Sequence, residues 1–99
     1  MIIVGGEFVV DPAERDAFLA SRLEIMRTSR THAGNLEYVM APDPIDDSRV
    51  ILFERWEDRA ALDAHLAEAR TSGAGAALTV TPTSVSIVAY EATEASRMA

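Results

Sequence analysis

The chain has 99 residues and no cysteine, which leaves room for one domain and excludes disulfides, thiol catalysis and thiolate metal sites. Sixteen carboxylates against nine arginines and no lysine give a formal charge of −7, which argues against nucleic acid or an anionic membrane surface as a partner. The first seven residues lack the basic stretch of a secretion signal, and only half of the uncharged stretch Thr71 to Tyr90 is apolar, so we expect a cytoplasmic protein without a membrane span.

The N-terminal third of the chain predicts a strand followed by a helix. Residues Ile2 to Val10 are rich in β-branched side chains, as is typical of a strand. Asp11 is placed to cap a helix whose first position is Pro12, and Gly34 is expected to end that helix. We expect Arg22, like most charged residues of this segment, to lie away from the buried side. That buried side is predicted from apolar residues at helical spacing, which are Phe18, Leu19, Leu23 and Met26.

Two further strands and a second helix follow. Leu36 to Ala41 and Arg49 to Glu57 are predicted strands, and the turn-forming residues between them indicate an antiparallel hairpin. Asp58 is placed to cap the second helix. The buried stripe of this helix is predicted to consist of Leu62, His65, Leu66 and Ala69.

The C-terminal third contains a connector, a strand and a tail. Thr71 to Pro82 is predicted to be a connector with one helical turn at Ala74 to Leu78, and Thr83 to Glu91 is predicted to be the last strand. Ala92 to Ala99 is expected to be a flexible tail. The resulting order, β-α-β-β-α-β, is that of the ferredoxin-like α+β fold, and residues 1–99 are expected to form a single domain.

The strands are apolar on both sides, which favours a homodimer. Two helices can cover only one face of a four-stranded sheet. On the second face, alternation places Val9, Ile51, Phe53 and Val88, a larger apolar patch than soluble monomers normally expose. Packing of two sheets face to face would bury this patch. The alternative is that the register of several strands is shifted by one residue, which would move their side chains to the other face.

The segment Val50 to Leu66 carries a specific pattern, in which a strand ending in Glu-x-Trp runs into a helix with an Ala-Leu-x-x-His sequence. Together with Asp11-Pro12 and the run Gly34 to Tyr38, it resembles the antibiotic biosynthesis monooxygenase family over nearly the whole chain. The resemblance implies a dimeric α+β barrel with a ligand cavity between sheet and helices in each subunit. The family includes cofactor-independent oxygenases, haem-degrading enzymes and a sugar-phosphate isomerase, so the fold alone does not settle the chemistry.

Four residues are candidates for the site: His65 as the catalytic base, and Trp56, Glu54 and Tyr38 as substrate-binding groups. A His with a near-neutral pKa suits proton abstraction from a phenolic or enolic substrate, and the alternative is a hydrogen-bonded core His. Trp56 either lines the cavity or packs in the core. Glu54 either has a pKa perturbed by burial or forms a salt bridge with an arginine. Tyr38 either binds a ligand carbonyl or packs on its strand.

Other residues are assigned no chemistry. His32 is expected to be a solvated residue at the helix end. His65 and Glu68 are two ligands without a third, so no metal site is predicted. Gly73 to Gly75 lacks the spacing of a phosphate-binding loop and is interpreted as a connector, and Gly5-Gly6 is expected to mark a bulge or a close backbone approach.

The leading hypothesis is a monooxygenase without cofactor, in which a small phenol or quinol deprotonated by His65 itself reduces dioxygen. Two alternatives remain: an isomerase that moves a proton through an enediol, and a non-catalytic ligand-binding or stress-associated dimer. Haem degradation is disfavoured, because that branch of the family has an Asn on the first strand where this chain has Gly6 or Glu7, and no His follows His65.

Overall fold

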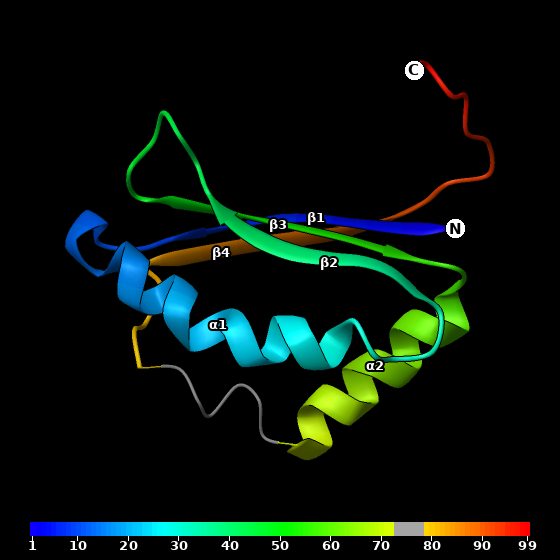
Figure 1. The fold of residues 1–99 in the computed structure, drawn as a ribbon, viewed down its shortest axis with the longest axis horizontal. Helices are drawn as coiled ribbons and strands as arrows, with labels where there is room; N and C mark the ends of the chain where they lie inside the picture. Colours follow the sequence, from blue (N-terminus) through cyan, green and yellow to red (C-terminus); the bar gives the residue numbers. More distant parts are fainter. Residues whose placement is uncertain (73–78) are drawn as a thin grey trace.

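The computed structural model describes residues 1–72 and 79–99, and it has the predicted ferredoxin-like α+β fold. Both helices lie on the same side of one four-stranded antiparallel sheet with strand order β2-β3-β1-β4 (Figure 1). The elements are β1 (Ile2–Val9), the 3-10 turn η1 (Pro12–Glu14), α1 (Arg15–Ser29), β2 (Asn35–Pro42), β3 (Arg49–Trp56), α2 (Arg59–Ser72) and β4 (Ser84–Glu91).

The two helix starts follow the predicted capping. The Asp11 side chain accepts a hydrogen bond from the Ala13 backbone N–H at 2.9 Å, and Asp58 accepts one from the Ala61 N–H at 2.8 Å. The first helix ends at Ser29, before Gly34, so Gly34 does not stop the helix as expected. It instead forms the turn into β2 with φ +80°, where a Cβ atom would come within 2.5 Å of the Ala61 Cβ.

The buried side of α1 differs from the prediction. Arg22 is only 6% exposed, whereas Leu23 is 46% exposed, so both assignments were wrong. The buried stripe runs at intervals of four, four and three residues through Phe18, Arg22, Met26 and Ser29. Leu23 was predicted to be buried because it is apolar. It lies about 100° around the helix from Arg22 and therefore does not face the sheet.

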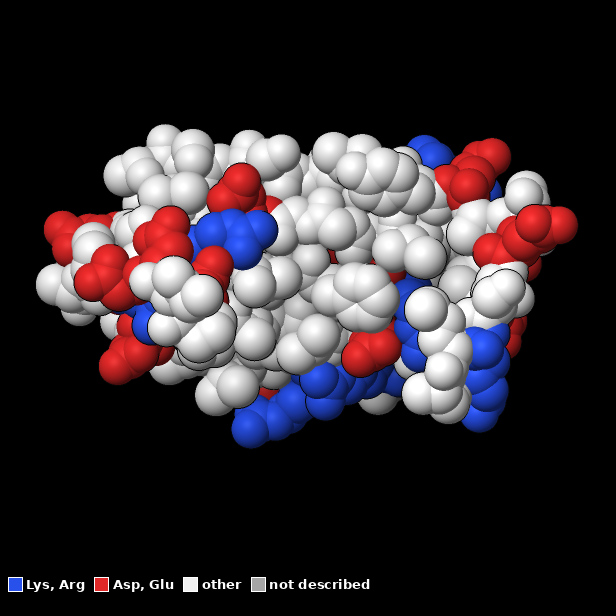
Figure 2. Space-filling view, turned by 90° about the horizontal axis from the view of Figure 1, so that it is seen from above, with Lys and Arg blue, Asp and Glu red and all other residues white. Residues whose placement is uncertain are grey.

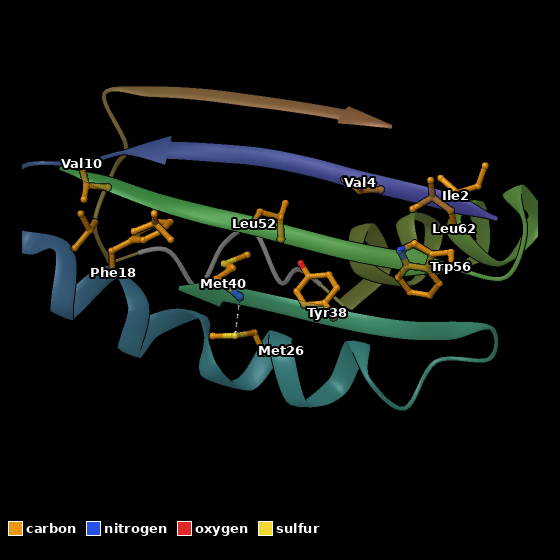
Figure 3. Close-up of a cluster of buried hydrophobic side chains, with 12 residues drawn as sticks. Ile2, Val4, Val10, Phe18, Met26, Tyr38, Met40, Leu52, Trp56 and Leu62 are labelled. Carbon is orange, nitrogen blue, oxygen red and sulfur yellow. Dashed lines mark hydrogen bonds between the residues drawn. The ribbon is translucent and has the colours of Figure 1, made fainter. Parts of the chain in front are cut away.

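The helix-covered face of the sheet, called the inner face from here on, holds the core. Alternate residues of β3 point to it as predicted, and Val50, Leu52, Glu54 and Trp56 are all buried. Figure 3 shows Met26 of α1 facing Met40 of β2, whose backbone N–H contacts the Met26 sulfur at 3.3 Å. On β1, a Cβ at Gly6 would lie 2.8 Å from the Ser86 carbonyl, which confirms a close backbone approach there.

The opposite face, called the outer face, is open. Strand register places Ile3, Val39, Ile51, Phe53, Val88 and Tyr90 on it. Figure 2 shows a largely uncharged middle, with charged side chains towards both ends and along one long edge of the view. The strand register places two ion pairs on this face, Arg49–Glu7 at 2.8 Å and Arg55–Glu37 at 3.2 Å. All residues of β4 are exposed, including the apolar ones. The sheet therefore has an uncovered apolar surface, as the alternation predicted.

The described part of the C-terminal third agrees with a final strand, although α2 extends into the segment predicted to be a connector. The helical turn predicted at Ala74 to Leu78 lies outside the described residues, as does the run Gly73 to Gly75. Residues 92–99 form no helix or strand, and they leave the sheet on the side away from the helices (Figure 1). Neither of the two described α-helices combines the length and apolarity needed to cross a membrane.

Candidate active site

A cavity of about 330 Å³ lies between the inner face and the two helices. Three of the four predicted site residues line it, each from a different element: Tyr38 from β2, Glu54 from β3 and His65 from α2. Arg22 of α1 lines it as well. Most of the remaining wall is apolar and includes Val4, Phe8, Ile25, Met40, Leu52, Leu62 and Ile87. The arrangement, a few polar groups in an apolar wall, is typical of small-molecule sites.

Glu54 and Trp56 form a buried pair on β3. The period of two along a strand puts both side chains on the inner face, and the Trp56 indole Nε1 donates a hydrogen bond to Glu54 Oε1 at 2.9 Å. Burial raises the pKa of Glu54 above its ordinary value, and this hydrogen bond acts in the opposite direction. Trp56 is fully buried and is not among the residues that line the cavity, so it acts behind the wall by holding Glu54 and contacting His65.

His65 is the centre of an aromatic cluster. Its ring centroid lies 4.6 Å from that of Trp56, 5.6 Å from that of Tyr38 and 5.1 Å from that of His32. The side chain is 5% exposed, and burial, together with neighbouring His32, lowers the pKa of His65 below its ordinary value. His65 is therefore neutral at pH 7 and able to accept a proton.

His32 is not the solvated residue that the sequence suggested. It is half-buried, and its Nδ1 lies 2.9 Å from the Nδ1 of His65, so one of the two nitrogens carries the proton and the other accepts it. Its Nε2 is buried and makes no hydrogen bond with any described residue. The turn at Gly34 folds the end of α1 over α2, which brings residues 33 positions apart into contact. Gly34 beside His32 was the one signal in the sequence that could have indicated this.

Tyr38 is buried and lies on the cavity wall next to His65. Burial, reinforced by the neighbouring Glu54, raises the pKa of Tyr38 to about 12. The phenol therefore keeps its proton at any physiological pH. As a neutral hydroxyl it can donate a hydrogen bond to a ligand carbonyl or phenolate.

A second cavity of about 250 Å³ lies between α1 and α2. It shares Arg22 and His65 with the cavity beneath the sheet. His32 lines this second cavity, and Glu24 and Glu68 add carboxylates to its wall. Across residues 1–72 and 79–99, no three His, Asp or Glu side chains converge in a way that could hold a metal ion. The described polar side chains in the two cavity walls can supply proton transfer and hydrogen bonding.

Comparison with known proteins identifies relatives of the larger part of the chain. A family model described as antibiotic biosynthesis monooxygenase matches residues 1–74. A protein of Synechocystis without an assigned function is 34% identical over 64 residues, which are 65% of this chain and 44% of that protein. The chain thus spans less than half the length of that relative.

Solved structures share the fold. A candidate antibiotic biosynthesis monooxygenase from Deinococcus radiodurans superposes with a TM-score of 0.87 at 26% identity, covering 100% of this chain and 99% of that one. SnoaB of Streptomyces nogalater, described as a cofactor-independent oxygenase, has a TM-score of 0.75 at 18% identity and covers 95% of this chain and 94% of its own. At that identity the second match bears on the fold alone.

Proposed function

The chain belongs to the antibiotic biosynthesis monooxygenase family, and we propose that it is a cofactor-independent monooxygenase acting on a small phenol or quinol in the cavity beneath the sheet. The observation that carries this proposal is a buried, neutral His65 on the wall of an apolar cavity, with the neutral Tyr38 hydroxyl beside it. SnoaB, which has the same fold, is described as an oxygenase that needs no cofactor.

In the proposed reaction, His65 takes the proton of the substrate hydroxyl. The resulting phenolate is electron-rich, and it transfers electrons to dioxygen, so that a C–O bond forms at a ring carbon and gives a peroxide. The O–O bond then breaks while that carbon loses its hydrogen, which leaves a carbonyl and releases water. A quinol C₆H₆O₂ and O₂ thus give a hydroxyquinone C₆H₄O₃ and H₂O, and the substrate supplies all the electrons.

Tyr38, Glu54 and the apolar part of the wall each have a role in this scheme. The Tyr38 hydroxyl hydrogen-bonds the second oxygen of the ring, and the apolar wall keeps water from the peroxide. Glu54, with its raised pKa, offers a further polar contact to the substrate and is held in place by Trp56. Because the reactants are held together and desolvated, the enzyme needs only one proton acceptor of its own.

The assembly that fits this proposal is a homodimer in which the outer faces of two copies pack together. A single copy leaves Tyr90 57% and Val88 45% exposed on that face. Soluble monomers seldom expose a continuous apolar patch of this extent. Packing the two outer faces gives the dimeric α+β barrel and leaves both cavities accessible from the helix sides.

Oxidation of a simple quinol under ¹⁸O₂ tests the proposed function. We expect oxygen uptake above the uncatalysed rate, and mass spectrometry should find one ¹⁸O atom in each hydroxyquinone. Hydrogen peroxide together with an unlabelled quinone would contradict a monooxygenase. Proton exchange or isomerisation of a substrate under nitrogen would favour the isomerase.

The variant His65→Phe tests the base. Phe keeps a ring against Trp56 and Tyr38, so the fold should be retained, whereas the turnover number should fall by roughly 10²-fold, the usual scale for loss of a general base. Arg70→Gln, further along α2, exposed and outside both cavity walls, is the control and should retain full turnover. Unchanged turnover in His65→Phe would remove His65 from the mechanism.

A further inference from the structure

Arg22 is the one arginine of the nine that is buried. It lies in the middle of the buried stripe of α1 and lines both cavities. Its Nε donates a long hydrogen bond, 3.4 Å, to the hydroxyl of the adjacent Ser21. Among the described residues it forms no ion pair with a carboxylate, and its side chain is 94% removed from solvent.

The two arginines of β3 are paired with carboxylates. Arg49 is held by Glu7 and Asp43, and Arg55 by Glu37. A buried charge without a partner destabilises a fold, because its lost hydration is not replaced. Burial accordingly lowers the pKa of Arg22 below its ordinary value, although a guanidinium stays charged at any physiological pH. An unpaired buried charge in the wall of a cavity is typical of a group that binds a ligand.

The charges around the two cavities decide where an anion would bind. Glu24 and Glu68 line the cavity between the helices and would repel a negative ligand. The cavity under the sheet has one carboxyl group, Glu54, and burial raises the pKa of Glu54. Its wall also has two arginines, Arg22 and Arg59, and Arg59 is paired with Asp63 at 3.1 Å. Arg22 is therefore the arginine of this wall that has no carboxylate partner among the described residues.

We infer that the substrate of the cavity under the sheet carries a carboxylate, which binds the guanidinium of Arg22. Arginine matches a carboxylate with two parallel N–H···O bonds, which are about twice as strong as bonds between neutral groups. The inference rests on the proposed function for the rest of the substrate, a small phenol or quinol ring. Arg22 then sets specificity and orientation, since a fixed carboxylate on α1 directs the ring towards His65 on α2.

The test uses 2,5-dihydroxybenzoate and its methyl ester, which share a quinol ring and differ in the charge. Binding is measured under nitrogen, so that no oxidation occurs, by calorimetry and by the fluorescence of Trp56, the single tryptophan of the chain, which contacts His65. The wild type should bind the acid at least about 10-fold more tightly than the ester, the scale of hydrogen bonds to a charged group. In Arg22→Met this preference should disappear while ester binding is retained.

Arg27→Met is the matched control, because Arg27 lies on the same helix with its side chain 70% exposed. It should keep the preference for the acid. Equal binding of acid and ester by the wild type, no binding of either, or an undiminished preference in Arg22→Met would each overturn the inference. Oxygen uptake separates the two proposals: oxidation of the ester without any preference for the acid would leave the monooxygenase standing, whereas a preference for the acid with no oxygen uptake would leave only the binding site.

Discussion

The two faces of the sheet treat their ionisable groups in opposite ways. On the inner face, burial raises the pKa of Glu54 and lowers the pKa of His65, so that both groups are driven towards their neutral forms. At one end of the sheet, hydrogen bonds to Glu7 and Asp43 raise the pKa of Arg49, and hydrogen bonds from the backbone and Arg49 lower the pKa of Asp43, so that both are held in their charged forms.

This contrast distinguishes two kinds of ionisable group within one small domain: groups that form the surface and groups that serve a site. Charged groups that are paired in contact with water cost little and contribute little. Neutralised groups that are withdrawn from water are costly to place, and they cluster where chemistry or recognition needs them. By this criterion we propose the inner face as the site, and the outer face, with its apolar middle and its ion pairs, as a surface for association.

The largest effect is expected from a charge in the middle of the outer face. Phe53 lies between Gly5 and Val39 of the neighbouring strands. Phe53→Asp should abolish the dimer and lower the free energy of unfolding by about 3 kcal/mol or more, because a lost aromatic contact combines with a charge against apolar neighbours. Sedimentation and urea denaturation measure the two effects. Leu23→Asp, at an exposed position of α1, should change neither, and a stable dimer of Phe53→Asp would refute the packing of outer faces.

A smaller effect is expected when the free energy of unfolding is measured against pH. Glu54 and Asp43 should contribute to it with opposite signs. The folded state holds the proton of Glu54 more tightly than the unfolded chain, so stability should fall as pH rises from 4.5 through the raised pKa of Glu54. Asp43 behaves conversely: its contribution is present above 3.8 and is lost as pH falls through its lowered pKa.

The variants Glu54→Gln and Asp43→Asn separate these two contributions. Urea midpoints of Glu54→Gln should lack the decline above pH 4.5, and those of Asp43→Asn should lack the decline below pH 3.8. Glu54→Gln should retain the fold, because the amide oxygen still accepts the hydrogen bond of Trp56. If the urea midpoint declines above pH 4.5 to the same extent in the wild type and in Glu54→Gln, then Glu54 is not the group that causes the decline.

Sequence patterns were sufficient for the parts of the molecule that repeat with a fixed period. The alternation along β3 placed Glu54 and Trp56 on the helix side, and the caps at Asp11 and Asp58 located both helix starts. The apolar stripe of α2 indicated that His65 would face the same space as Trp56, and their rings lie 4.6 Å apart.

Two polar residues near the site could not be predicted in this way. Arg22 was assigned to the surface because charged residues usually lie there, yet the buried stripe of α1 passes through it. His32 was assigned to solvent because it follows a helix end, yet the turn at Gly34 places it on His65. Both errors have one cause: the cost of burying a polar group is local, whereas the contact that makes it useful comes from a distant part of the chain.

The smallest expected effect is a change in the pKa of His65 when one of the two causes that lower it is removed. Burial is the larger cause and the neighbouring His32 the smaller. His32→Phe removes the second cause, keeps a ring in place, and leaves His65 as the single histidine of the chain, so its NMR titration is unambiguous. In the wild type the Nδ1 atoms of the two rings lie 2.9 Å apart. The pKa of His65 should rise in the variant but stay below the ordinary value of 6.5, because burial remains.

A folded state with a lowered His pKa loses stability as pH falls through 6.5, so the same variant should lose less stability on acidification than the wild type. If the pKa of His65 instead falls in His32→Phe, then His32 stabilises the protonated ring by accepting its Nδ1 proton. In that case His32 would be a positioning residue for the base.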